Sequence, residues 1–275
     1  ETVAGVVAGA APATAATPVG GGAGAFTLPG HVRSRRLQAL VEEIRRFPEA
    51  GHEMMYHAVR KLCDYQNDRF ARAYLGRLRL FRERTGADGD LLREVARHSG
   101  LWMAFEDLPR TAQLKISAAR FRRFREEVRA EPGQLVDMVE FLHPRVQEFA
   151  GLMPAPLGRF VLRKRWARRF LGLFEGPRHI RTNSIPGFLS FYLIASCRHW
   201  RRWSLAFREE SEARERWLSA VENLARSDAD AALVLARCAR LIKGYSNTRE
   251  RGQWQLNHIL DAVARGHRDA ESIQA

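Results

Sequence analysis

Cysteine, acidic residues and long apolar runs are scarce in this 275-residue chain, and each shortage excludes a class of protein. Its three cysteines, Cys63, Cys197 and Cys238, are too few and too scattered for a disulfide framework or a four-thiolate iron–sulfur cluster. We expect them to be reduced and packed, as in a cytoplasmic protein. No GxSxG or P-loop motif occurs, no GxGxxG opens a helix, and no set of convergent metal ligands is evident. The sequence therefore predicts no catalytic residue, no metal and no cofactor bound by this segment.

The longest apolar stretch is also short. Residues Phe188 to Ala195, interrupted by Ser190, fall well below the roughly 20 residues that a membrane-spanning helix needs. No secretory signal is visible at the first residues. Because the chain starts at Glu1 without an initiator methionine, we expect it to be part of a longer polypeptide.

Lys and Arg outnumber Asp and Glu, and the excess of positive charge is concentrated in one stretch of the chain. The formal net charge is +14, and the fifty residues from Arg159 to Arg208 hold twelve Lys or Arg and one acid, Glu175. Such a field favours an anionic partner, and the alternative is a solvated basic face. The residues predicted to dock an anionic partner are Arg163, Lys164, Arg168, Arg169, Arg201 and Arg202.

Two other anionic partners are weaker alternatives. The stretch Leu157 to Phe174 predicts one basic helix with an apolar stripe, which suits an anionic membrane surface but equally a helix that faces a core. Helices expected on both sides favour the core. Residues 198–203 alternate cations with aromatic side chains, as nucleic-acid-binding surfaces do, yet no RNP, KH, helix-turn-helix or zinc-finger signature accompanies them. The sequence therefore argues against nucleic acid and membrane as partners.

Hydrophobic periodicity predicts an all-α fold. Residues 1–30 are rich in Ala and Gly and predict a flexible linker, which implies a domain upstream, whereas residues 31–275 form a helical domain with a subdivision possible near 131–156. We expect an irregular multi-helix bundle of about nine to eleven helices and no strand. The first predicted helix begins near residue 37. The others span residues 49–62, 64–84, 91–108, 114–130, 135–142, 157–174, 187–200, 204–226, 228–243 and 247–266.

Three motifs place polar side chains at the ends of apolar helices: Leu62 to Gln66, Leu101 to Asp107 and Cys238 to Gly252. Their polar groups either satisfy one another inside the bundle or form a ligand site, and the first interpretation is favoured because a buried acid needs a partner. The candidate residues are Asp64, Tyr65, Glu106, Asp107, Arg110, Lys115, Lys243, Tyr245 and Thr248.

A specific contact is predicted between two of these motifs. The alanines Ala232, Ala236 and Ala239 let a neighbouring helix approach, and Gly244 is suited to end the helix after Lys243. We expect Glu106 to be partly buried and to approach Lys243, together with Asp107. If Lys243 instead faces solvent away from both acids, it is better suited to an external anion such as a cofactor phosphate.

In this order, the three motifs resemble the C-terminal helical region of the indolepyruvate ferredoxin oxidoreductase beta subunit family. The resemblance runs from about Arg36 to Val263, although Asn67, Pro109, Gln113 and the pair Ser246 and Asn247 depart from the family pattern, as in a diverged member. It implies a part of an enzyme complex that converts arylpyruvates to aryl-acetyl-CoA, with ferredoxin accepting the electrons.

The same resemblance places the thiamine diphosphate and iron–sulfur clusters of such a complex on a partner subunit, and no catalytic residue carries over to this chain. It implies an accessory or assembly region that contacts the thiamine-binding subunit, ferredoxin or both, and that is inactive alone. The alternative is a stand-alone helical module that docks an acidic protein and has no part in redox chemistry.

Overall fold

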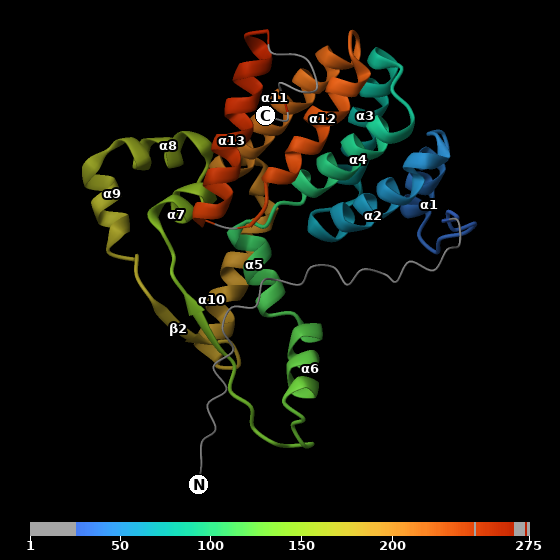
Figure 1. Ribbon diagram of the computed structural model, residues 1–275. Helices are drawn as coiled ribbons and strands as arrows, with labels where there is room; N and C mark the ends of the chain where they lie inside the picture. Colours follow the sequence, from blue (N-terminus) through green and yellow to red (C-terminus); the bar gives the residue numbers. More distant parts are fainter. Residues whose placement is uncertain (1–25, 245, 267–272, 274–275) are drawn as a thin grey trace.

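The structure, a computed structural model, describes residues 26–244, 246–266 and 273, and it confirms an all-α multi-helix fold (Figure 1). Thirteen α-helices lie within these residues, together with one two-stranded sheet. In chain order the elements are α1 (Arg35–Ile44), α2 (Glu49–Tyr65), α3 (Asp68–Thr85), α4 (Gly89–Met103), α5 (Leu108–Lys115), α6 (Ala118–Glu127), β1 (Val139–Leu142), α7 (Val146–Leu152), α8 (Ala155–Arg163), α9 (Arg165–Gly172), β2 (Arg178–Arg181), α10 (Ile185–Ser196), α11 (Leu205–Ala225), α12 (Ala229–Cys238) and α13 (Ser246–Ala264). Short 3-10 helices are η1 (Cys197–His199), η2 (Arg201–Trp203) and η3 (Ala239–Leu241).

One large hydrophobic core joins α1 to α4 with α11 to α13, and we call this part the bundle (Figure 1). Its largest aromatic side chains keep their polar atoms paired. The Tyr74 hydroxyl donates to the Ala96 carbonyl at 2.8 Å, and the Trp217 indole donates to the Leu235 carbonyl at 3.1 Å. These bonds remove the cost of burying the polar end of each ring.

Small residues set the closest helix contacts in the bundle. A Cβ atom at Gly100 of α4 would lie 2.5 Å from the Ala58 Cβ of α2, so these helices touch backbone to backbone. The predicted alanine stripe Ala232, Ala236 and Ala239 is buried, and α12 packs on α4 and α11. The stripe therefore allows the close approach that the sequence predicted.

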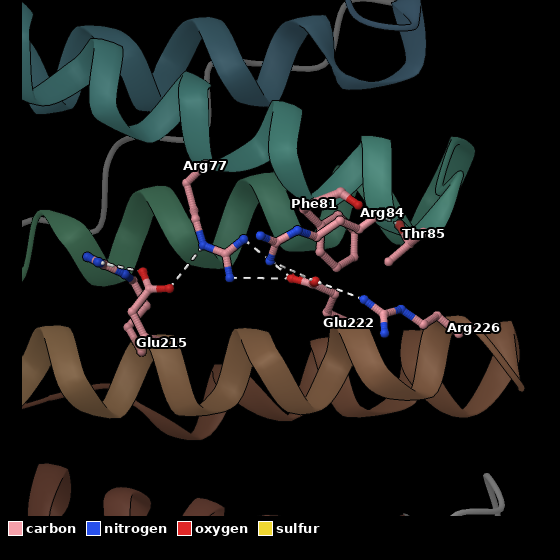
Figure 2. Close-up of polar contacts among 8 residues, drawn as sticks. Arg77, Phe81, Arg84, Thr85, Glu215, Glu222 and Arg226 are labelled. Carbon is pink, nitrogen blue, oxygen red and sulfur yellow. Dashed lines mark hydrogen bonds and ion pairs between the residues drawn. The ribbon is translucent and has the colours of Figure 1, made fainter.

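A buried carboxylate ties α3 to α11 (Figure 2). The Glu222 side chain is 6% exposed and pairs with Arg77 at 3.4 Å, Arg84 at 3.1 Å and Arg226 at 3.3 Å. Arg77 also contacts Glu215 at 2.9 Å. Three guanidinium groups around one carboxylate supply the partners that a buried charge requires.

Residues 108–196 lie outside the main core and bury smaller apolar clusters. One cluster joins α5 with α10 around Ala112, Phe191 and Ala195, and another joins α7 to α9 around Ala150, Val161 and Ala167. Figure 1 shows α6, α10 and β2 extending from one end of the bundle. The subdivision near residues 131–156 stays a prediction.

Three expectations about this segment are wrong. The helix predicted over 114–130 is two helices, because Ser117 caps α6 by accepting a hydrogen bond from the Arg120 amide at 3.3 Å. The helix predicted over 157–174 breaks at Lys164, whose φ of −91° and ψ of 116° are extended. The helix predicted over 135–142 is absent from the structure. Its last residues form β1, which pairs antiparallel with β2, with Glu140 opposite Ile180.

The strand β1 was not predicted because its charged residue faces inward and its apolar residues face outward. Glu140 points inward and is buried, whereas Val139 and Phe141 are exposed. Its partner strand lies about 40 positions later, so local pattern carried no signal of the pairing.

The end of the predicted linker packs on the bundle. Leu28 is buried in the main core, and the Phe26 ring lies 5.6 Å from the Tyr56 ring. Residues 1–25 lie outside the described residues. In the described part of the chain, no helix combines the length and apolar character needed to cross a bilayer.

Candidate functional site

Two of the three predicted polar motifs meet at Asp107, which begins α5. Asp107 Oδ1 accepts the Arg110 amide at 2.8 Å and so caps the helix. The same carboxylate accepts two bonds from Arg201, at 2.5 and 3.0 Å, and one from the Tyr65 hydroxyl at 3.3 Å. The Asp64–Gln66 and Glu106–Asp107 motifs therefore converge, but on an arginine that neither motif contains.

Arg201 occupies the centre of this network, and its side chain is 0% exposed. Its Nη1 donates to the Tyr65 carbonyl at 2.8 Å and to Gln66 Oε1 at 2.7 Å. Its guanidinium carbon lies 3.9 Å from the centre of the Tyr65 ring, a cation–π contact. We call these four residues, Tyr65, Gln66, Asp107 and Arg201, the Arg201 clamp. The prediction that Arg201 docks an external anion is wrong, because an internal carboxylate already holds it.

The clamp is built to hold its parts in place rather than to exchange protons. Burial raises the pKa of the Tyr65 phenol well above its usual value, the Asp107 carboxylate raises it further, and Arg201 opposes both. Tyr65 therefore stays neutral and donates. Each side-chain polar group of the clamp has a hydrogen-bond partner, with Gln66 Nε2 donating to the Arg198 carbonyl at 3.2 Å. Two of the motifs are thus satisfied inside the fold, but through Arg201 rather than by one another, and the third motif takes no part.

Further ion pairs continue from the clamp along α5. Arg110 pairs with Asp64, which tethers α5 to the end of α2. Lys115 pairs with the buried Glu140 of β1, and Arg120 joins the same carboxylate at 2.6 Å. Lys115 and Arg110 thus stabilise the segment that follows the bundle.

The predicted approach of Lys243 to the acids is wrong. Glu106 and Lys243 are both exposed, and Lys243 forms no ion pair with any acid that the structure describes. Asp107 pairs with Arg201 instead, because η2 positions Arg201 beside Tyr65. Thr248 is exposed and lies beside Gly244, whose φ is +76°, and Tyr245 lies outside the described residues.

Lys243 lines a cavity of about 470 Å³ that the motifs alone did not reveal. We call it the basic cavity. Its lining comes from α4, α12, η3, α13 and the residues between η3 and α13: Glu94, Arg97, His98, Leu101, Trp102, Arg237, Ala239, Arg240, Ile242, Lys243 and Arg249. The sequence offered two signals, Lys243 as a possible ligand for an external anion and the arginines beside Cys238. The other cations of the lining come from helices distant along the chain.

A second exposed feature lies on α8 and α9, and we call it the arm surface. Phe160 and Trp166 contact edge to face at 6.0 Å, and Phe170 and Phe174 at 6.2 Å. The exposed side chains of the arm surface are Leu157, Phe160, Arg163, Lys164, Arg165, Trp166, Arg168, Arg169, Phe170, Leu173 and Phe174. Four predicted docking residues therefore share one surface with aromatic rings, whereas Arg202 is exposed in η2 beside the clamp.

Residues 51–262 match the sequence family described as "Family of unknown function (DUF6537)". The match covers most of the chain, including the Arg201 clamp and the arm surface, so the chain belongs to this family. Comparisons with curated proteins and with solved structures gave no match. Across the described residues, no three His, Cys, Asp or Glu side chains gather as metal ligands would.

Proposed function

We propose that this chain is an accessory helical module that supports assembly of a 2-oxoacid:ferredoxin oxidoreductase acting on arylpyruvates. In this proposal it docks on the thiamine-binding subunit through the arm surface and supplies no complete active site. The order of its three polar motifs, which resembles the beta subunit family, suggests the enzyme. The arm surface is the observation that supports docking.

The arm surface has the composition of a protein interface. Trp166 is 67% exposed and Phe170 60%, whereas α9 buries only Ala167. A helix that leaves its aromatic side outward lacks a covering partner, and exposed apolar patches of this kind mark interaction sites. Aromatic residues and arginine are also the types enriched in interface centres.

The charge of the arm surface indicates the chemistry of the partner. Arg163, Lys164, Arg165, Arg168 and Arg169 form no ion pair with any described acid. Unpaired cations around aromatic rings complement an acidic protein surface, which steers the encounter while the rings bury apolar area. The stand-alone docking module, without redox chemistry, would use the same surface, so the identity of the partner decides between the two functions.

The test measures binding of the full chain to the thiamine-binding subunit of an indolepyruvate:ferredoxin oxidoreductase and, separately, to its ferredoxin. We expect binding to the subunit that weakens steeply between low and physiological salt, because exposed charges are screened over about 8–10 Å. Replacing Trp166 and Phe170 with alanine should weaken it at least tenfold, as loss of central interface anchors does.

A matched control is available on α13, where Trp254 is also 67% exposed. Trp254→Ala should leave the affinity unchanged. Equal losses from Trp166→Ala and Trp254→Ala, or an affinity that ignores salt, would contradict docking through the arm surface. Binding to an unrelated acidic protein with no affinity for either oxidoreductase component would favour the stand-alone module.

A further inference from the structure

The basic cavity holds more positive charge than its acids neutralise. Arg249 pairs with Glu210 at 2.6 Å, and Arg237 lies 4.0 Å from Asp90. Arg97, Arg240 and Lys243 form no ion pair with any acid within the described ranges, and all three are exposed at the cavity. Three cations from separate elements that form no ion pair therefore face one concave space, and Glu94 is the single acid among its lining residues.

The backbone fixes this convergence. A Cβ atom at Gly252 would lie 2.0 Å from the Leu241 carbonyl oxygen, so α13 lies against η3 at that point. Arg249 lies one turn before Gly252, and Arg240 is in η3 itself. Glu210 accepts the Trp102 indole at 2.7 Å as well as Arg249, which ties α4 to α13 through α11. The cavity walls are thus held by the bundle rather than by free side chains.

Burial and the charged groups that line the cavity shift the pKa of His98. Burial lowers its pKa, Arg97 and Arg240 lower it further, and Glu94, which lies 3.4 Å away, acts in the opposite direction. Two of the three cations without an ion pair are therefore close enough to act on the same imidazole. The apolar part of the lining, Leu101 and Ile242, lies beside these charges.

We propose that the basic cavity binds a small phosphorylated molecule, with Arg97, Arg240 and Lys243 holding a diphosphate and Leu101 and Ile242 contacting its organic part. Guanidinium groups match phosphate oxygens in a planar, two-bond geometry, and lysine adds a point charge. A cavity of about 470 Å³ falls in the range of small-molecule sites. This site lies on α4, α12, η3 and α13, so it is independent of docking through α8 and α9.

Calorimetric titration of the full chain with inorganic pyrophosphate tests the proposal, with orthophosphate and adenosine diphosphate as further probes. We expect pyrophosphate to bind more tightly than orthophosphate. Arg97→Gln, Arg240→Gln and Lys243→Gln should each weaken it about tenfold, the effect of one charged hydrogen bond. Arg60→Gln removes the same charge from an exposed position of α2, outside both the basic cavity and the arm surface, and should change the affinity less than twofold.

Proton NMR of His98 adds a readout that general charge attraction would not move. Bound diphosphate should raise the His98 pKa, because an adjacent anion favours the imidazolium form. No pyrophosphate binding at millimolar concentration, or equal losses from Lys243→Gln and Arg60→Gln, would overturn the proposal. Adenosine diphosphate that binds no more tightly than pyrophosphate would overturn the role given to Leu101 and Ile242.

Discussion

Arg201 and Asp107 are 94 positions apart in the chain, yet two hydrogen bonds join their side chains at the edge of the bundle. The arginine side chain is fully buried and the carboxylate nearly so. Either charge without the other would be left in a place that water cannot reach. The pair therefore holds two distant segments together and makes each residue dependent on the other.

Replacing one member of this pair should destabilise the fold strongly. Arg201→Met or Asp107→Leu should lower the free energy of unfolding by about 3–5 kcal/mol, because each leaves a buried charge unpaired. The double variant should lose less than the sum of the two. Urea denaturation of the four proteins measures this, and Arg216→Met, which breaks the exposed Arg216–Asp261 pair, should cost at most about 1 kcal/mol. Additive losses would show that Arg201 and Asp107 act separately.

Gly252 should not tolerate a side chain. Gly252→Ala places a methyl group against the Leu241 carbonyl and should cost about 1–3 kcal/mol, since η3 and α13 must separate. Gly76 in α3 has open space around its Cβ position, so Gly76→Ala should be neutral or stabilise by about 0.5–1 kcal/mol. Thermal denaturation of both variants gives the comparison. A Gly252→Ala protein as stable as the parent would mean that the close contact is not required.

The carboxylate of Glu222 should matter more than an exposed one. Glu222→Gln removes the charge shared by Arg77, Arg84 and Arg226, and we expect a loss of about 1.5–3 kcal/mol, typical of buried charged hydrogen bonds. Glu83→Gln breaks an exposed pair with Arg79 and should cost under about 0.5 kcal/mol. Chemical denaturation separates the two. Equal effects would contradict the view that this network fixes α3 against α11.

His98 should make stability depend on pH. Its folded-state pKa lies below the value of about 6.5 for an unfolded histidine, so the unfolded chain takes up the proton first as pH falls. The contribution of neutral His98 to the free energy of unfolding is complete above pH 6.5 and is lost as pH decreases toward the lowered pKa of His98. Unfolding free energies at pH 7.5 and 5.5 should differ less in His98→Gln than in the parent, and equal differences in the two proteins would contradict the role of His98.

The isolated chain should not oxidise indolepyruvate or phenylpyruvate, even with coenzyme A, thiamine diphosphate and ferredoxin added. The reason is that its sequence offers no nucleophile motif and no cofactor-binding motif. A coupled assay of ferredoxin reduction with the purified chain measures this. Turnover above a heat-denatured control would refute the accessory role.

Helices could be predicted from the sequence where periodicity and caps agree. Asn67, Ser204 and Asp228 each accept an amide bond at the start of a helix that spacing already indicated. The strand β1 could not be predicted, because its buried residue is charged and its partner is distant. Local pattern records which side of an element is apolar, and here that side is exposed.

The candidate site was predictable only in part. Tyr65 and Asp107 were recognised as polar groups beside apolar helices, and they do meet. Arg201 is predicted from the sequence to be an exposed docking cation, because its neighbours Arg198 and Arg202 are also arginines and such clusters are typical of a solvated surface. Nothing local distinguishes a buried arginine from an exposed one when its carboxylate is supplied by another part of the chain. The basic cavity could not be predicted either, because its lining residues come from helices that are distant along the chain.

The position of the Arg201 clamp also bears on how the length of this chain can vary. Asp107 stands where the chain leaves the bundle, and Arg201 stands where it returns before α11. The clamp joins the two ends of the segment between them, and within that segment α7 and α8 also pack on α11. Each connection between its helices is therefore a loop with both ends fixed. Lengthening such a loop costs little, because closure entropy grows only with the logarithm of its length. We therefore expect members of the family to differ by insertions and deletions between these two residues while the helices on either side keep their lengths.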